Sequence, residues 1–309
     1  MNLYLPIAEM SVNIWLLLSM GAAVGFLSGL VGVGGGFMMT PLLIFLGIPP
    51  AVAVGTGSAQ VVASSVAGAM AQYQRDNVDI KMGLVLLAGG LAGTLIGVEA
   101  VRVLRRMGQF DLVVALAYLT LLGSVGALMM TESISAIRKV RSGGKVMSRR
   151  ASEHVWVHGL PFKMRFRRSK LYISALPPIA IGAFVGFLAA IMGIGGGFIV
   201  VPALIYLLRM PTSVAVGTSL FQIVFVSAAA TILQATLNQT VDLALAVLLV
   251  IGGVIGAQLG TAASGKVRGE QLRFLLAVLI LLVGVRVAYD LVLEPAERYS
   301  ITTLMPGLE

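Results

Sequence analysis

The stretch GVGGGFMMTP, Gly32 to Pro41, decides the fold, and it recurs almost unchanged as GIGGGFIVVP, Gly193 to Pro202. Each copy follows a long apolar run and opens a short one. Three consecutive glycines are costly in a continuous helix, since each loses about 1 kcal/mol of helix propensity relative to alanine. We therefore expect a helix break at each copy. Backbone groups freed within hydrocarbon must be buried in protein or line a cavity, so two matching breaks predict a transport site between two repeats.

The composition indicates an all-α polytopic membrane protein. Hydrophobic residues make up 58% of the chain, charged residues only 11%, and the mean hydropathy is +0.97. A soluble domain has about 25% charged residues, so soluble globular folds are excluded. The chain has no cysteine, which excludes disulfides and thiolate metal sites. The N-terminus lacks the basic region of a cleaved signal peptide, so the first apolar run is expected to be a membrane segment.

Five apolar segments are expected in the first half. The second of them has about ten residues, roughly half a bilayer at 1.5 Å per residue. In chain order they are Trp15 to Val31, Phe37 to Leu46, Ala51 to Gln72, Met82 to Leu104 and Phe110 to Met130.

The same pattern restarts in the second half. GFLSGLVGVGGGF from Gly25 matches GFLAAIMGIGGGF from Gly186 at 8 of 13 positions, and VAVGT occurs at both Val52 and Val214. Matches in several segments at nearly constant spacing indicate internal duplication. We therefore divide the chain into a first membrane repeat, 1–131, a basic cytoplasmic loop, 132–171, and a second membrane repeat, 172–309.

The distribution of positive charge predicts the topology. The net charge is +9, but 11 of the 22 Lys and Arg residues lie between Arg138 and Lys170. A short basic loop between apolar segments is cytoplasmic under the positive-inside rule, which favours a membrane protein over a nucleic-acid binder. Five crossings per half fit this rule better than four, so we expect inverted repeats, with the termini on the face opposite the loop.

The doubled G-[VI]-GGG-F-x-x-x-P motif, each copy followed by VAVGT, resembles the TauE/SafE sulfite exporter family, also called toluene sulfonate uptake permeases. The resemblance covers about Trp15 to Leu293. It implies a multi-pass transporter of the bacterial-type inner (plasma) membrane, moving sulfite, organosulfonates or related small sulfur-containing anions. The alternative that we keep is an anion channel, which saturable flux with counterflow would exclude.

The motifs also suggest how an anion is held. A half-helix that begins near the bilayer midplane presents unpaired N–H groups and the positive end of its dipole. Two glycine runs would let the backbone approach the anion, and hydroxyl and carboxamide groups would add hydrogen bonds. The alternative is that the glycines serve helix packing and the hydroxyls bond their own helix. The predicted substrate-binding residues are Gly34, Gly35, Gly36, Thr56, Ser58, Gln60, Gly195, Gly196, Gly197, Thr218, Ser219 and Gln222. We expect valine at Gly35 or Gly196 to weaken binding while folding is largely kept.

Other chemistry is weakly supported. Glu99 is a candidate for coupling transport to protons, although Arg102, three residues on, would pair with it in a helix. His154 and His158 have metal-ligand spacing, but no third ligand is apparent, so no metal and no other cofactor is expected. No catalytic cluster indicates an enzyme. The expected partners are a small anionic substrate, sulfite or a sulfonate, and membrane lipid, with a homodimer as a candidate assembly and no nucleic acid.

Overall fold

The computed structural model describes residues 2–31, 34–141, 163–166, 168–169, 171–264 and 269–292. In the first half the helices are α1 (Ile14–Val31), α2 (Gly36–Phe45), α3 (Pro50–Gln74), α4 (Ile80–Arg106) and α5 (Phe110–Arg141). In the second half they are α6 (Leu176–Met192), α7 (Gly197–Tyr206), α8 (Thr212–Leu233), the π-helical turn η1 (Gln234–Asn238), α9 (Leu243–Ser264) and α10 (Gly269–Val292). His154 and His158 lie outside the described residues.

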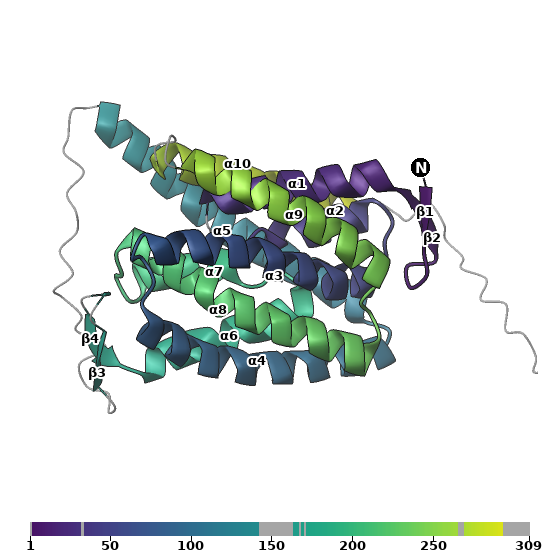
Figure 1. Cartoon of the computed structure of the whole chain (residues 1–309), viewed down its shortest axis with the longest axis horizontal. Helices are drawn as coiled ribbons and strands as arrows, with labels where there is room; N and C mark the ends of the chain where they lie inside the picture. The colour runs from purple at the N-terminus through teal and green to yellow at the C-terminus, as the bar shows by residue number, and fades with distance from the viewer. Residues whose placement is uncertain are drawn as a thin grey trace, which may run out of the picture.

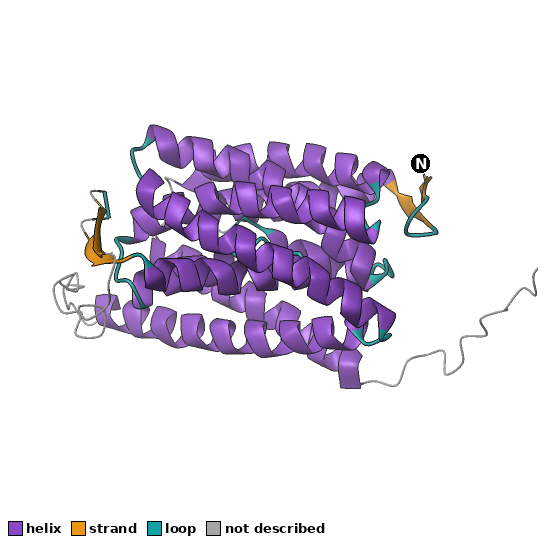
Figure 2. Cartoon of the chain, turned by 90° about the horizontal axis from the view of Figure 1, so that it is seen from below, coloured by secondary structure: helices purple, strands orange, loops and turns teal. Residues whose placement is uncertain are grey.

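The all-α polytopic membrane fold is confirmed. Within the described residues five helical stretches are long and apolar enough to cross a membrane, and shorter apolar helices accompany them. The long stretches lie in α3, α4, α5, α8 with η1, and α9. Figure 2 shows the helices packed side by side as one bundle with their axes in roughly the same direction. The helix α5 continues to Arg141, beyond the predicted end at Met130, because no Gly or Pro interrupts the sequence before Gly143.

The predicted break is present at each glycine motif. Gly34 and Gly35 have φ of +87° and +67°, and Gly195 and Gly196 have φ of +64° and +77°. Glycine adopts these left-handed values without the steric cost that a Cβ brings. The helices α1 and α6 therefore end at the motif, and the short helices α2 and α7 begin directly after it.

A β-hairpin precedes each half. The strands β1 (Asn2–Leu5) and β2 (Met10–Asn13) pair antiparallel, and so do β3 (Lys163–Phe166) and β4 (Leu171–Ser174). Each first strand begins 12 residues before α1 and 13 before α6. The registers start at Asn2 with Asn13 and at Lys163 with Ser174, which is the spacing of 161 residues already seen between Gly25 and Gly186. The segment 132–171, treated as a loop from the sequence, thus contains the end of α5 and most of the second hairpin.

Helices of one half pack on helices of the other in a reciprocal way. The most extensive contacts are α1 with α9 and α4 with α6, followed by α5 with α10 and α3 with α8. If α6 to α10 correspond to α1 to α5, exchanging the halves turns the α1–α9 pairing into the α4–α6 pairing and leaves the α5–α10 and α3–α8 pairings unchanged. Figure 1 shows the two hairpins at opposite ends of the bundle, as expected for halves that run in opposite directions. These contacts support the predicted inverted repeats.

Single cysteines in the hairpins should test this arrangement. Tyr4 and Tyr172 are exposed in different hairpins, and the chain has no cysteine of its own. We expect a membrane-impermeant thiol reagent to label Tyr4→Cys from outside the cell and Tyr172→Cys only after the membrane is opened. The cysteine-free parent is the control and should stay unlabelled. Labelling of both positions from the same side would contradict inverted repeats.

Candidate functional site

The two half-helices meet at the centre of the bundle. They begin at Gly36 and Gly197, directly after the left-handed glycines Gly35 and Gly196, and the N–H of Gly36 donates to the carbonyl of Gly34 at 2.9 Å. The first N–H groups of a helix have no partner within it and carry the positive end of the dipole. The rings of Phe37 and Phe198, one residue into each half-helix, lie 5.8 Å apart between centroids. Two positive helix ends therefore lie close together, as the doubled motif predicts.

Branched apolar side chains pack against the two breaks, which also touch each other directly, since a Cβ placed on Gly36 would meet the carbonyl of Ile194. A Cβ placed on Gly36 or on Gly195 would contact the side chain of Val61 on α3. A Cβ on Gly34 or on Gly195 would contact Ile223 on α8. Val61 and Ile223 are fully buried. The methyl groups of Val61 and Ile223 therefore pack directly against the glycine runs in this closed conformation.

Two serine hydroxyls lie directly beside the breaks. Ser65 Oγ is 3.1 Å from a Cβ placed on Gly34, and Ser227 Oγ is 2.9 Å from one placed on Gly195. Both serines are buried, and within the described part of the chain neither hydroxyl has a hydrogen-bond partner. Sequence reasoning missed them. The signal was available, because Ser65 and Ser227 are 162 residues apart, as are Gln60 and Gln222.

The carboxamides of Gln60 and Gln222 are also buried and unpaired. Their residues are 0% and 1% exposed, and neither Oε1 nor Nε2 has a partner among the described residues. Each Nε2 lies against a glycine of the other half. The distance is 2.9 Å from Gln60 to a Cβ placed on Gly253, and 3.0 Å from Gln222 to one placed on Gly90. A buried unpaired polar group costs about 1 to 3 kcal/mol, so four such side chains at matching positions call for a ligand.

The threonines of the two VAVGT motifs are used for structure. Thr56 Oγ1 accepts a hydrogen bond from the backbone N–H of Asp242 at 3.0 Å, and Thr218 Oγ1 accepts one from the N–H of Asp79 at 3.0 Å. Each bond joins the start of α3 or α8 to the residue that precedes a long helix of the other half. The motif therefore fastens the two halves to each other.

The two aspartates extend this connection to the hairpins. Asp242 accepts hydrogen bonds from the N–H of Leu245, in the first turn of α9, and from Ile7 in the first hairpin, at 3.1 and 3.0 Å. Asp79 caps α4 through the N–H of Met82 and holds Ser169 of the second hairpin through its N–H and Oγ, at 3.2, 3.0 and 2.7 Å. A capping aspartate stabilises a helix by about 1 kcal/mol. Each carboxylate thus ties one hairpin to one end of the bundle.

The remaining predicted polar residues are either hydrogen-bonded within the protein or buried without a partner in the described residues. Ser58 donates to the carbonyl of Val54 and Ser219 to that of Val216, both at 2.9 Å within their own helices. Of the predicted hydroxyl and carboxamide groups, only Gln60 and Gln222 are buried without a partner in the described residues. Glu99 is 56% exposed and pairs with Arg102 at 2.7 Å, so its carboxylate lies at the surface. A coupling role for Glu99 stays a prediction.

Replacement of Thr56 or Thr218 by valine should lower the stability of the protein without changing its affinity for substrate. The change keeps the shape and removes the acceptor, which leaves the N–H of Asp242 or Asp79 unpaired. We expect the free energy of unfolding to fall by about 1 to 3 kcal/mol with substrate affinity unchanged, as measured by denaturation and by binding to the folded fraction. The control is Thr120→Val, because Thr120 is exposed on α5 and bonds only within its own helix. If the Thr56→Val protein is stable but binds substrate more weakly, Thr56 contributes to substrate binding as the sequence predicted.

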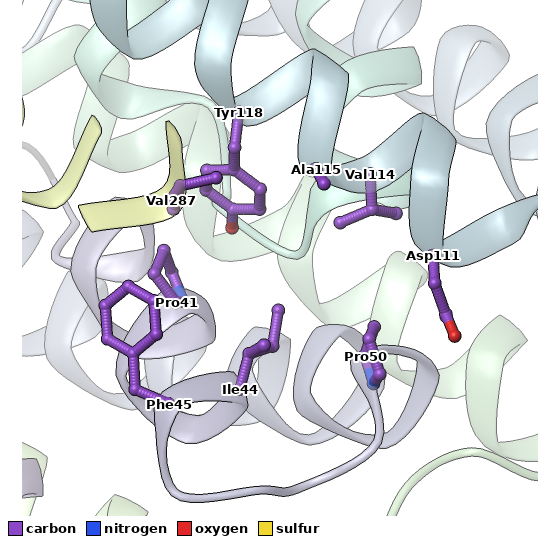
Figure 3. Close-up of a pocket in the computed structure, with 9 residues that line it drawn as sticks. All are labelled: Pro41, Ile44, Phe45, Pro50, Asp111, Val114, Ala115, Tyr118 and Val287. Atoms are coloured by element: carbon purple, nitrogen blue, oxygen red, sulfur yellow. The ribbon is translucent and has the colours of Figure 1, made fainter. Parts of the chain in front are cut away.

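An apolar hollow, drawn in Figure 3, is separate from the candidate site. It has a volume of about 140 Å³ and lies between α2, α3, α5 and α10. Its walls are apolar apart from Asp111 and Tyr118, and the Tyr118 hydroxyl already donates to the carbonyl of Met192 at 2.7 Å. A hollow that presents a carboxylate does not suit a small anion. The lining residues are Pro41, Ile44, Phe45, Pro50, Asp111, Val114, Ala115, Tyr118 and Val287.

Secondary membrane transporters are typically polytopic helix bundles in which broken helices meet at a buried binding site. This chain has the same arrangement, with buried hydrogen-bonding groups beside its two helix breaks. Comparison with known proteins agrees. Residues 17–287 match the family described as Sulfite exporter TauE/SafE. The chain belongs to this family and is a multi-pass membrane transporter of the plasma membrane, not an enzyme.

Named relatives span the same region. The chain is 27% identical to the probable membrane transporter protein YunE of Bacillus subtilis, over 89% of this chain and 97% of the relative. It is 30% identical to a probable membrane transporter protein of Xylella fastidiosa, over 78% of this chain and 81% of the relative. A shorter match, 30% identical, covers 30% of this chain and 20% of Sulfite exporter TauE/SafE family protein 3 of Arabidopsis thaliana. No solved structure matches the chain.

Proposed function

We propose that this protein is a carrier of sulfite, organosulfonates or related small sulfur-containing anions. The anion binds between the two helix breaks, near the backbone of Gly34 to Gly36 and Gly195 to Gly197. The observation that carries the proposal is that, of the buried side chains without hydrogen-bond partners in the described chain, four occupy matching positions in the two halves: Gln60, Gln222, Ser65 and Ser227. Ser28 and Thr40 are also buried without a partner there. The family name, sulfite exporter, supports the substrate class.

The chemistry of these groups suits a sulfur oxyanion. Each carboxamide offers two N–H donors and each serine one O–H donor, while the starts of α2 and α7 add two positive dipole ends. The oxygens of a sulfite or sulfonate group are acceptors only. A bound anion would therefore satisfy donors that have no partner among the described residues, and the cost of burying them would be recovered on binding.

The closed site also fits a carrier better than an open pore. Gln60, Gln222, Ser65 and Ser227 are all at most 1% exposed, so an anion reaches them only after helices move. A carrier that opens alternately to each side provides such a movement when its two halves are related by inverted symmetry. A channel would instead need a continuous polar path past the breaks, against which Val61 and Ile223 now pack.

Flux into proteoliposomes tests the proposal. The purified chain should exchange at least one of sulfite, sulfate, sulfoacetate, taurine and an aryl sulfonate, with saturable rates and with counterflow from vesicles loaded with the unlabelled compound. Protein-free vesicles are the control. Folded, correctly inserted protein that exchanges none of these compounds would overturn the proposed substrate class, and non-saturable flux without counterflow would favour a channel.

A further inference from the structure

The candidate site contains hydrogen-bond donors but no cation. Among the residues whose burial the structure describes, the buried charged side chains are Asp79 and Asp242, and no lysine or arginine is buried. Arg209 is exposed at the end of α7, and the guanidinium of Arg286 lies over the ring of Phe45, 5.5 Å from its centroid. Gln60, Gln222, Ser65 and Ser227 are all neutral. Any charge that the substrate brings is therefore balanced by dipoles alone.

Dipoles compensate one buried negative charge far better than two. The cost of moving an ion out of water rises with the square of its charge, so a dianion pays roughly four times the desolvation penalty of a monoanion of the same size. The attraction to fixed neutral donors rises only in proportion to the charge. Proteins that bury strongly charged groups therefore pair them with opposite charges or metals, and this site supplies neither.

The apolar side chains beside the helix breaks also favour an anion with a single charge and a carbon substituent. Val61 and Ile223 pack against the helix breaks, beside the hydroxyls of Ser65 and Ser227. An organosulfonate has three acceptor oxygens on one side and a carbon substituent on the other, so it can present oxygens to the donors and carbon to the methyl groups. Sulfate has oxygens on every side, and the oxygens that face Val61 and Ile223 would lose their hydrogen bonds to water.

We infer that the site selects singly charged sulfur oxyanions, namely organosulfonates and hydrogensulfite, and rejects doubly charged ones such as sulfate and fully deprotonated sulfite. The inference rests on the proposed function, that a sulfur anion binds at this site, and it adds the charge state. It also means that sulfite is carried in its protonated form, so that one proton accompanies each anion without a dedicated coupling residue.

Binding to the unmodified, purified chain tests the charge rule directly. Methanesulfonate and sulfate are similar in size and differ in charge. We expect methanesulfonate to bind at least about tenfold tighter at equal ionic strength. Sulfite should bind more weakly as the pH rises from mildly acidic to mildly alkaline, in proportion to the remaining hydrogensulfite. Methanesulfonate keeps one charge over that range, so it controls for pH effects on the protein.

A variant locates the measured binding. Gln222→Met should weaken methanesulfonate binding at least about tenfold, because the change removes two donors without adding charge. Two results would overturn the inference while leaving the proposed function standing: sulfate binding as tightly as methanesulfonate, or sulfite affinity that rises with pH. Full methanesulfonate affinity in both Gln222→Met and Gln60→Met would place the anion away from these carboxamides and overturn the proposed site together with the inference. If neither methanesulfonate nor sulfite binds the folded protein at any pH, the proposed function fails and the inference falls with it.

Discussion

Gln222→Met should bind substrate at least about tenfold more weakly than the parent and yet be more stable to unfolding. The carboxamide of Gln222 is 1% exposed and has no partner within the described residues. Methionine has nearly the same length and shape, so it keeps the packing and removes the desolvation penalty of two unpaired polar atoms. The free energy of unfolding should rise by about 1 kcal/mol, as followed by denaturation in detergent.

The matched control is Gln234→Met, twelve residues further along the chain. Gln234 is also 1% exposed, but its Nε2 donates to the carbonyl of Ala190 at 3.0 Å and its Oε1 accepts from Asn238 at 2.7 Å. Methionine at position 234 would leave the carbonyl of Ala190 and the side-chain amide of Asn238 without these hydrogen bonds. The free energy of unfolding should therefore fall by about 2 to 4 kcal/mol. A Gln222→Met protein that is destabilised to the same degree would show that Gln222 has a structural partner and is not held open for a ligand.

Gln60→Met should repeat this result in the other half. Gln60 has the same burial and the same unpaired atoms, and it faces Gly253 as Gln222 faces Gly90. If one anion is shared by the two halves, each single variant should lose binding. Normal binding in either variant would restrict the site to the other half.

Alanine at Gly93 or Gly256 should cause the largest loss of folded protein. A Cβ on Gly93 of α4 would collide with the carbonyl of Ala183 on α6, and one on Gly256 of α9 with the carbonyl of Ala22 on α1. These are the two most extensive helix pairings in the molecule. Both collisions involve backbone, which cannot rotate away, so we expect at least the upper end of the overpacking cost, about 3 kcal/mol.

Gly123→Ala is the control for this effect. Gly123 lies within α5, and a Cβ there meets nothing within 4 Å. Alanine should therefore raise stability by about 0.5 to 1 kcal/mol through helix propensity alone. The measurement is the yield and thermal unfolding of the purified proteins. Well-folded Gly93→Ala and Gly256→Ala would show that the α1–α9 and α4–α6 crossings are looser than the structure has them.

Packing also corrects one expectation drawn from the sequence. Valine at Gly35 or Gly196 was expected to block the anion while folding is largely kept. Both glycines have positive φ, a Cβ on Gly35 would lie 2.9 Å from Ser28 Cβ, and one on Gly196 would collide with the side chain of Val185. Valine at either position should therefore disturb the break itself, and loss of binding would not report on the anion. The glutamine variants are the cleaner test.

The sequence alone was enough for the membrane class, the segments and the helix breaks, because these depend on local properties. Hydropathy decides that a segment lies in the membrane, and a run of glycine breaks a helix whatever surrounds it. The short helices α2 and α7 accordingly begin within one residue of expectation at Gly36, and directly inside the second motif at Gly197. Gln60 and Gln222 could be chosen because they recur at matching places.

The tertiary structure decided which polar groups are free. Thr56 and Gln60 are one turn apart on α3, and the sequence alone gives no reason to treat them differently. The hydroxyl of Thr56 accepts a hydrogen bond from the N–H of Asp242, which is 186 residues away, whereas the carboxamide of Gln60 lies against Gly253 of α9 and has no hydrogen-bond partner among the described residues. Whether a polar side chain is satisfied depends on a partner brought near by folding, so no local pattern distinguishes the two. The second hairpin lies in a basic stretch and is held by the distant residue Asp79, which accepts hydrogen bonds from Ser169, so the local sequence did not predict it.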